Sequence, residues 1–187
     1  ITFDDGYEGV FTFARKILNE SSIKRKIVFP IVDYIGKYNT WDTSFYLNKY
    51  KHLNINQIKT LISEGWEIGS HTCKHKYLGS LSGDEILKEL VDSKEKLENI
   101  INTKVTSFAP PYGILSKKIF EMCKRAGYKE IFIQKNKNVR NIVDIKVVER
   151  NNIYSIDRNS NIINKINNSR PEKRKENYIS SLNIMTR

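Results

Sequence analysis

The chain has 187 residues, of which 39% are hydrophobic and 28% are charged. This length predicts one domain, and the composition supplies enough apolar surface for a packed core, which excludes general disorder. The longest apolar runs, such as residues 26–32, fall far short of the ~20 residues that cross a bilayer, which excludes a membrane-spanning helix.

The net charge of +11 is uneven, because residues 117–187 carry 17 Lys or Arg against 7 Asp or Glu. A basic half can indicate nucleic acid, an anionic polymer or membrane headgroups as a partner. The basic residues are interleaved with Asn and Ile and form no recognised nucleic-acid-binding motif, so we favour codon bias and expect no nucleic acid partner. Two cysteines, Cys73 and Cys123, exclude a disulfide-dense scaffold and leave open one disulfide or two free thiols.

Strands and helices alternate along the chain. The first residues form the end of a strand that we expect to begin before Ile1, so that the domain is slightly truncated at its N-terminus. The predicted strands are residues 1–3, 26–32, 66–70, 106–109, 130–134 and 145–149, with 152–156 as a further candidate. The predicted helices are residues 7–21, 54–64, 82–100 and 116–126. Asn54 or Asn56 would cap the second helix, and Ser82 with Glu85 forms a capping box for the third.

This alternation predicts an α/β fold with parallel strands and with helices outside them. We assign residues 1–157 to this domain and residues 158–187 to a last helix and a basic polar tail. In such folds the functional residues lie at the carboxyl ends of the strands. Three segments of the sequence stand at such positions.

The first segment is Thr-Phe-Asp-Asp-Gly at residues 2–6. Adjacent carboxylates just past a strand point in different directions. Asp4 and Asp5 can therefore do different tasks, one binding a metal ion while the other accepts a proton. The alternative is an ordinary Asp-Asp-Gly turn.

The second segment is His-Thr-Cys-Lys-His at residues 71–75, directly after a predicted strand. If the segment turns helically, His71 and His75 lie on one face and can bind one ion from the same side. Cys73, two positions from each histidine, should point away from that ion. The alternative is a pair of surface histidines in a loop.

The third segment is Phe-Ala-Pro-Pro-Tyr-Gly at residues 108–113. Two prolines fix the backbone, and such a rigid turn can present a backbone N–H in the direction that an oxyanion site requires. An ordinary strand-to-helix turn is the alternative.

Taken in order, the three segments resemble the polysaccharide deacetylase family, the NodB-homology domain of family 4 carbohydrate esterases. The resemblance covers residues 1 to about 127 by motif and extends to about 157 by length. It implies a distorted (β/α)7-type barrel that removes acetate from an N-acetylated polysaccharide or sugar by metal-dependent hydrolysis. It also favours an extracytoplasmic location, in the cell envelope or secreted.

The same resemblance implies one divalent metal ion held by Asp5, His71 and His75. We expect Zn²⁺, with Co, Ni, Mn or Fe as alternatives. Thr72 would brace the histidine loop by hydrogen bonding. Such an ion would acidify a water molecule and polarise the amide carbonyl.

Asp4 would be the general base by the same resemblance, and the backbone N–H of Tyr112 would help to hold the oxyanion. The catalytic residues are therefore predicted to be Asp4 and Tyr112.

The sequence departs from the family pattern in three places. The third motif of the family usually begins with an Arg that orients the base, and this chain has Ala109 there. A branch of the family that acts on poly-N-acetylglucosamine also has an Ala-containing third motif. No Asp-x-x-Asp-Trp-like motif follows residue 127, and no histidine follows His75 to protonate the leaving amine. His52 is the remaining imidazole, and its alternatives are a replacement acid or a solvent-facing side chain.

These departures motivate a second hypothesis, a glycan-binding pseudoenzyme that keeps the metal site but has little turnover. A two-histidine-one-carboxylate oxygenase fits the ligand set, but the order of the motifs does not support it. The segment at residues 36–53 and the residues near it are rich in aromatics, which could stack on sugar rings or pack on one another. These aromatics are Tyr34, Tyr38, Trp41, Phe45, Tyr46 and Tyr50.

Overall fold

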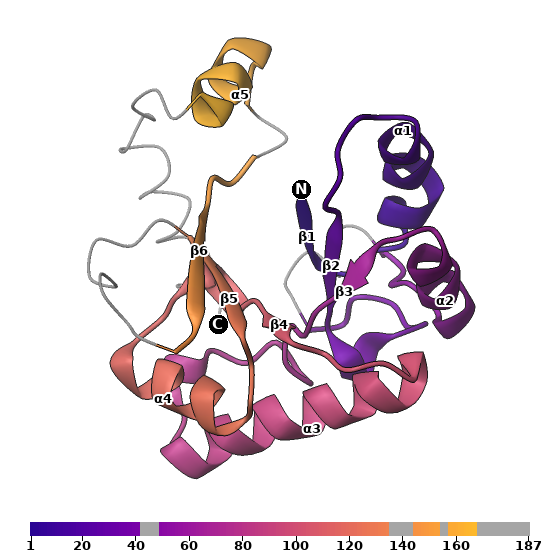
Figure 1. Cartoon of the computed structure of the whole chain (residues 1–187). Coiled ribbons are helices and arrows are strands. Elements are labelled where there is room, and N and C mark those ends of the chain that lie inside the picture. The colour runs from indigo at the N-terminus through magenta and orange to yellow at the C-terminus, as the bar shows by residue number, and fades with distance from the viewer. Residues whose placement is uncertain (42–48, 135–143, 154–156, 168–187) are drawn as a thin grey trace.

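The computed structural model describes residues 1–41, 49–134, 144–153 and 157–167 (Figure 1). The strands are β1 (Thr2–Asp5), β2 (Ile27–Pro30), β3 (Glu67–Ile68), β4 (Ser107–Phe108), β5 (Glu130–Gln134) and β6 (Lys146–Arg150). The α-helices are α1 (Arg15–Asn19), α2 (Ile55–Ser63), α3 (Gly83–Ile101), α4 (Lys117–Arg125) and α5 (Asn159–Ile166). The candidate strand at 152–156 is not formed in its described part, and the polar tail lies outside the described residues.

All strand pairs are parallel, as predicted. β1, β2 and β3 form one sheet in that order, and β4, β5 and β6 form a second. An isolated parallel bridge between Ser70 and Phe108 joins the two sheets, with Ser70 N–H donating to the Ser107 carbonyl over 2.9 Å. The six strands therefore follow one another in chain order, and their carboxyl ends lie on one side.

The predicted seven-stranded barrel is not confirmed. Among the described residues β1 and β6 remain as the two edges of the arrangement, with no backbone ladder between them. Closure of a barrel requires such a ladder. The edges are connected instead by side chains, because Arg150 of β6 reaches Asp4 of β1.

Helices α2 and α3 begin where the sequence predicts. Asn54 caps α2 in a capping box with Gln57, and Ser82 caps α3 in the same way with Glu85. The predicted helix at 7–21 is broken, because residues 10–14 form a π-helix and only α1 is α-helical. π-Helical turns often stand at functional sites, and this one follows the turn at the end of β1.

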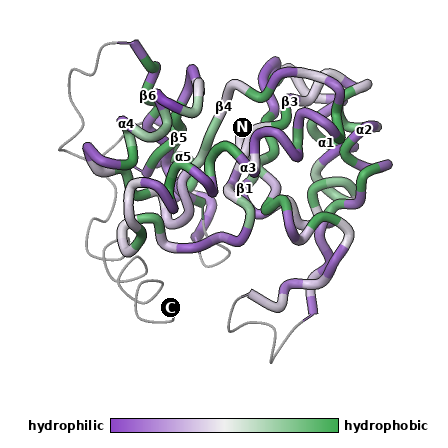
Figure 2. Tube along the Cα trace, turned by 90° about the horizontal axis from the view of Figure 1, so that it is seen from below, coloured by the Kyte–Doolittle hydropathy of each residue, from purple (hydrophilic) through white to green (hydrophobic). Residues whose placement is uncertain are grey.

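Helices α1 to α4 cover the outside of the sheets, with α1 and α2 beside β1–β3 and α3 running beneath both sheets next to α4 (Figure 1). Along α3, hydrophobic and hydrophilic residues alternate (Figure 2), and its apolar residues Ile86, Leu90 and Leu97 are fully buried. No helix in the described ranges is long and apolar enough to cross a membrane. Cys73 and Cys123 are both buried free thiols and form no disulfide with each other.

Candidate metal and catalytic site

The candidate functional side chains gather at the carboxyl ends of the strands. They come from the end of β1, the loop after β3, the turn after β4 and the end of β6, and they comprise Asp4, Asp5, His71, His75, Tyr112 and Arg150. The parallel pairing places these ends on one side of the sheets, as the topology rule predicts.

The three predicted metal ligands meet. Asp5 Oδ1 lies 3.3 Å from His71 Nε2 and 3.4 Å from His75 Nε2. One donor atom from each of the three residues lies within 4.8 Å of the others, and both histidines are buried. Cys73 belongs to no such group in the described part of the chain, in line with its predicted direction.

The cluster fits a small divalent ion. Metal–ligand bonds of 2.0–2.1 Å at tetrahedral angles would separate two ligand atoms by about 3.4 Å, close to the observed spacings. Asp5 Oδ1 is buried, and among the described residues no donor meets it with hydrogen-bond geometry. Buried polar atoms rarely lack a hydrogen-bond partner. A divalent cation bound by the one carboxylate and two imidazoles would supply a partner for Asp5 Oδ1.

Electrostatics also prepare Asp5 for this role. Burial opposes the charged carboxylate, but the close contact with His71, and the positive charge that His71 and His75 carry when they are protonated, hold the pKa of Asp5 below its ordinary value. The carboxylate is therefore ionised at neutral pH, as a metal ligand must be.

A carbonyl fixes the orientation of His71. His71 Nδ1 lies 2.7 Å from the Ala109 carbonyl oxygen, which can only accept, so Nδ1 carries the proton. The lone pair on Nε2 is then directed at the cluster, an arrangement common among metal-binding histidines. Ala109 thus contributes its backbone to the site.

The backbone of the site is strained. Asp5, Thr72, His75 and Tyr112 have φ values of 65°, 68°, 56° and 65°, a region that non-glycine residues seldom adopt. Thr72 Oγ1 accepts a hydrogen bond from the His75 N–H over 3.0 Å and so braces the loop. Such strain persists only where the surroundings impose it, and it clusters at functional sites.

One glycine is required for this packing. A Cβ on Gly69 would lie 2.3 Å from the Phe29 ring, and no real Cβ comes so close. Because Gly69 has no side chain, β3 can lie against β2 where the chain enters the histidine loop.

An arginine that sequence reasoning missed holds the predicted base. Arg150 Nη1 and Nη2 donate to Asp4 Oδ1 and Oδ2 over 2.6 and 2.8 Å, and Nη1 also donates to Thr2 Oγ1 over 3.0 Å. The Arg150 side chain is only 11% exposed. Its place at the end of a predicted strand was the available signal, but it is one of 32 basic residues.

His52 differs from both expectations, because it is neither solvent-facing nor placed as an acid. It is 1% exposed, its Nδ1 lies 2.9 Å from the Asp5 carbonyl oxygen, and Trp41 Nε1 donates to its Nε2 over 3.2 Å. An indole N–H can only donate, so Nε2 accepts and Nδ1–H donates to Asp5. His52 therefore supports the backbone of a predicted metal ligand.

Some of the described aromatic residues near His52 pack on the site, and others are half exposed. The Trp41 ring packs 4.1 Å from the His75 ring, and Tyr34 lies 5.7 Å from His52. Tyr38 and Tyr50 are half exposed. Phe45 and Tyr46 lie outside the described residues.

Tyr112, the predicted oxyanion residue, adjoins the cluster. It lies in the turn after β4, with its ring 4.9 Å from that of His75. The structure thus brings Asp4, Asp5, His71, His75 and Tyr112 to one place.

Comparison with known proteins gives consistent matches. Residues 1–131 match the family profile of polysaccharide deacetylases. The chain is 27% identical over 131 residues to a peptidoglycan-N-acetylglucosamine deacetylase of Bacillus cereus, covering 70% of this chain and 54% of that protein. It is 28% identical over 133 residues to the peptidoglycan-N-acetylmuramic acid deacetylase PdaA of Bacillus subtilis, covering 71% of this chain and 44% of that protein.

The fold matches solved structures of the same kind. IcaB from Ammonifex degensii superposes with a TM-score of 0.67 at 21% identity, covering 82% of this chain and 66% of that one. The chain spans about half the length of the two curated relatives. Since the family profile covers well over half of its residues, the chain belongs to the polysaccharide deacetylase family.

Proposed function

We propose that this chain hydrolyses the acetamido group of an N-acetylated glycan and releases acetate. The observation that carries the proposal is the juxtaposition of the Asp5–His71–His75 cluster with Asp4, whose two oxygens are fixed by Arg150. A carboxylate beside a group of metal-binding side chains can act as a base toward water that a bound metal ion would acidify, and such water can attack an amide.

Asp5, His71 and His75 would hold one divalent ion, with Zn²⁺ as our first expectation. When bound, such an ion polarises a carbonyl and acidifies water. Asp4 acts as the general base. It takes a proton from the attacking water while the oxygen of that water bonds to the acetyl carbon. Arg150 keeps the carboxylate of Asp4 in one orientation and is a positioning residue.

The Tyr112 N–H donates to the oxyanion that this attack creates. The C–N bond then breaks, and the amine nitrogen needs a proton. His52 is not placed to give one, because its Nε2 accepts from Trp41 and its Nδ1–H is directed at Asp5. Asp4, which has just gained a proton, returns it to the amine, leaving acetate and a free amino sugar.

The two curated relatives are named for different amino sugars of peptidoglycan, and IcaB is a structural neighbour. We infer that the substrate is an N-acetylated glycan of the cell envelope and that the protein acts outside the cytoplasm. A panel of N-acetylglucosamine and N-acetylmuramic acid oligomers would identify the sugar.

The test is acetate release from that panel, with and without chelator, by wild type and His71→Ala. We expect release by wild type, loss with chelator, recovery on adding Zn²⁺, and a variant that contains less metal and is inactive. Equal metal content in both proteins would contradict the ligand assignment. Chelator-resistant release would contradict metal dependence.

A glycan-binding pseudoenzyme is the second candidate, because the described site offers no imidazole placed as an acid. It predicts a metal-loaded wild type that binds the oligomers, as measured by calorimetry, but releases no acetate from any of them.

A further inference from the structure

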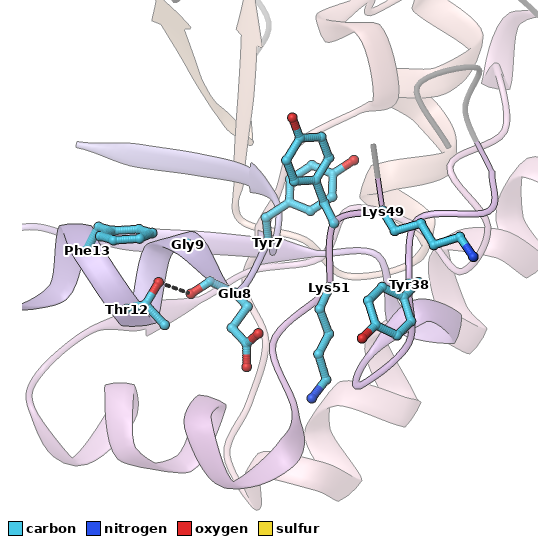
Figure 3. A pocket seen from close by; sticks show the side chains of 9 residues that line it. Tyr7, Glu8, Gly9, Thr12, Phe13, Tyr38, Lys49 and Lys51 are labelled. Carbon is cyan, nitrogen blue, oxygen red and sulfur yellow. Dashed lines mark hydrogen bonds between the residues drawn. The ribbon is translucent and has the colours of Figure 1, made fainter. Parts of the chain in front are cut away.

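A cavity of about 710 Å³ lies next to the segment that follows β1 (Figure 3). Its wall is built from the segment after β1, from Tyr38 and from residues 49–51, and aromatic side chains supply much of it. Ligand cavities of proteins typically have this size and this mainly apolar lining.

The aromatic residues of this cavity are unusually exposed. Phe13 is 75% exposed, Tyr38 51% and Tyr50 50%. The Tyr7 and Tyr50 rings meet edge to face, with their centroids 5.8 Å apart. Flat rings with polar tips suit a pyranose, which has apolar faces and hydroxyl groups around its edge.

The cavity wall is held by backbone hydrogen bonds. Tyr38 pairs with Lys51, and Tyr7 pairs with His52, as antiparallel bridges. Tyr50 N–H donates to Asn39 Oδ1 over 2.7 Å, and Asn39 N–H donates to the Tyr50 carbonyl over 2.9 Å. A wall that is already ordered lowers the entropic cost of binding.

The cavity adjoins the metal cluster through two contacts. Tyr7 is two residues after the ligand Asp5, so their Cα atoms lie at most about 7.6 Å apart. The Tyr7 ring stacks on His52 at 4.6 Å, and His52 in turn donates to the Asp5 carbonyl. One short oligosaccharide could therefore occupy both places.

The charges of the cavity are predominantly positive. Lys49, Lys51 and Glu8 line it, and Glu8 Oε1 already accepts a hydrogen bond from Gln57 Nε2 over 2.8 Å. Within the part of the chain that the structure describes, Lys51 forms no ion pair. An anionic group on the ligand would supply a partner for this ammonium group.

We propose that this cavity is a second sugar subsite, and that it takes a carboxylate-bearing sugar unit of the same glycan strand whose N-acetyl group lies at the metal cluster. This inference rests on the proposed function and specifies its substrate. It assigns ring stacking to Tyr50 and recognition of the carboxylate to Lys51.

The probes are an N-acetylglucosamine monomer, its neutral tetramer, and a peptide-free tetramer that alternates N-acetylglucosamine with N-acetylmuramic acid. We expect Tyr50→Ala to lower the ratio of kcat/KM for the neutral tetramer over the monomer about tenfold, and Tyr50→Phe to change it less than twofold. We expect Lys51→Gln to lower the ratio for the acidic over the neutral tetramer about fivefold at low salt, and less at high salt.

Lys24→Gln is the matched control, because exposed Lys24 precedes β2 at the opposite end of the strands, and it should change neither ratio. An unchanged tetramer-to-monomer ratio in Tyr50→Ala would overturn the subsite. An unchanged acid-to-neutral ratio in Lys51→Gln would overturn its carboxylate specificity.

Absence of acetate release from every probe would count against the proposed function and not against the subsite. Calorimetric binding of the tetramers then decides the subsite. Weaker binding by Tyr50→Ala than by Tyr50→Phe supports it, and equal binding overturns it.

Discussion

Arg150 donates a hydrogen bond to each carboxylate oxygen of Asp4, although the two residues are 146 positions apart in the sequence. Asp4 stands on the first strand of the described fold and Arg150 ends the last. The pair spans the two open edges of the strand arrangement and at the same time fixes the proposed base. The family resemblance places an Arg at the position of Ala109, whereas in this structure the guanidinium comes from Arg150 of β6.

This contact predicts the behaviour of Arg150 variants. Arg150→Ala should lower kcat about ten- to a hundredfold while KM and metal content change little, because the Asp4 carboxylate loses its fixed orientation. Arg150→Lys should recover only part of the loss, since an ammonium group cannot form the bidentate pair. Steady-state kinetics and metal analysis measure these changes.

Arg15→Ala is the control for loss of a partly buried ion pair, because Arg15 pairs with Glu64 on the outer helices. It should lower stability without changing kcat. An Arg150→Ala enzyme with wild-type kcat, or one whose defect is entirely in metal content, would contradict the positioning role.

The sequence allowed prediction of those site residues that stand in short motifs at strand ends. The family resemblance implied that Asp5, His71 and His75 hold one ion. Parallel pairing of β1, β2 and β3 is the physical reason why the ends of strands that carry these residues lie on one side. The capping box at Ser82 was also predictable, since it depends on residues three positions apart, and the structure selects Asn54 from the two predicted caps, Asn54 and Asn56.

The long-range partners could not be predicted in this way. In the sequence nothing distinguishes Arg150 from the other basic residues of a basic chain. Its contact with Asp4 is known only once the positions of β6 and β1 in the fold are known. The burial of His52 depends on how residues 49–53 fold back on the turn after β1, where Leu53 N–H donates to the Gly6 carbonyl over 2.8 Å. No periodic pattern encodes that loop.

The Asp4 carboxylate itself provides a second prediction. Asp4→Asn should retain the metal and lose about two to four orders of magnitude in rate, as expected when a general base is removed. Acetate release and elemental analysis are the measurements. Loss of metal in Asp4→Asn, together with retention in Asp5→Asn, would reverse the assignment of the two carboxylates.

A third prediction concerns the support of Asp5 by His52. His52→Ala removes the donor to the Asp5 carbonyl and leaves the Trp41 N–H without its acceptor, so we expect metal affinity to fall about ten- to a hundredfold. At saturating metal the rate should fall less than tenfold, because His52 is not the acid. Metal titration and acetate release separate the two effects.

His52→Asn is the matched variant, because its side-chain amide can place an N–H near the position of Nδ1. It should recover part of the lost metal affinity. A hundredfold loss of rate in His52→Ala at full metal occupancy would show instead that His52 delivers the proton to the leaving amine.

The last prediction concerns stability at low pH and the opposite end of the strands. Hydrogen bonding to Arg25, together with Lys146 at 2.9 Å, lowers the pKa of Glu130 from 4.5 to about 2. A lowered folded-state pKa stabilises the fold above the unfolded value of about 4.5 and loses that effect as pH falls toward 2. The shift is equivalent to at most about 3.4 kcal/mol, and less after screening, because the Arg25 side chain is 42% exposed. Glu130→Gln should therefore lower the free energy of unfolding by about 1–3 kcal/mol at pH 7, and by less than half as much at pH 3. Urea unfolding at the two pH values measures this difference.

Glu121→Gln, at an exposed position of α4, should show neither effect. A Glu130→Gln deficit that is equal at pH 7 and pH 3 would show that Glu130 stabilises the fold through packing and not through its charge.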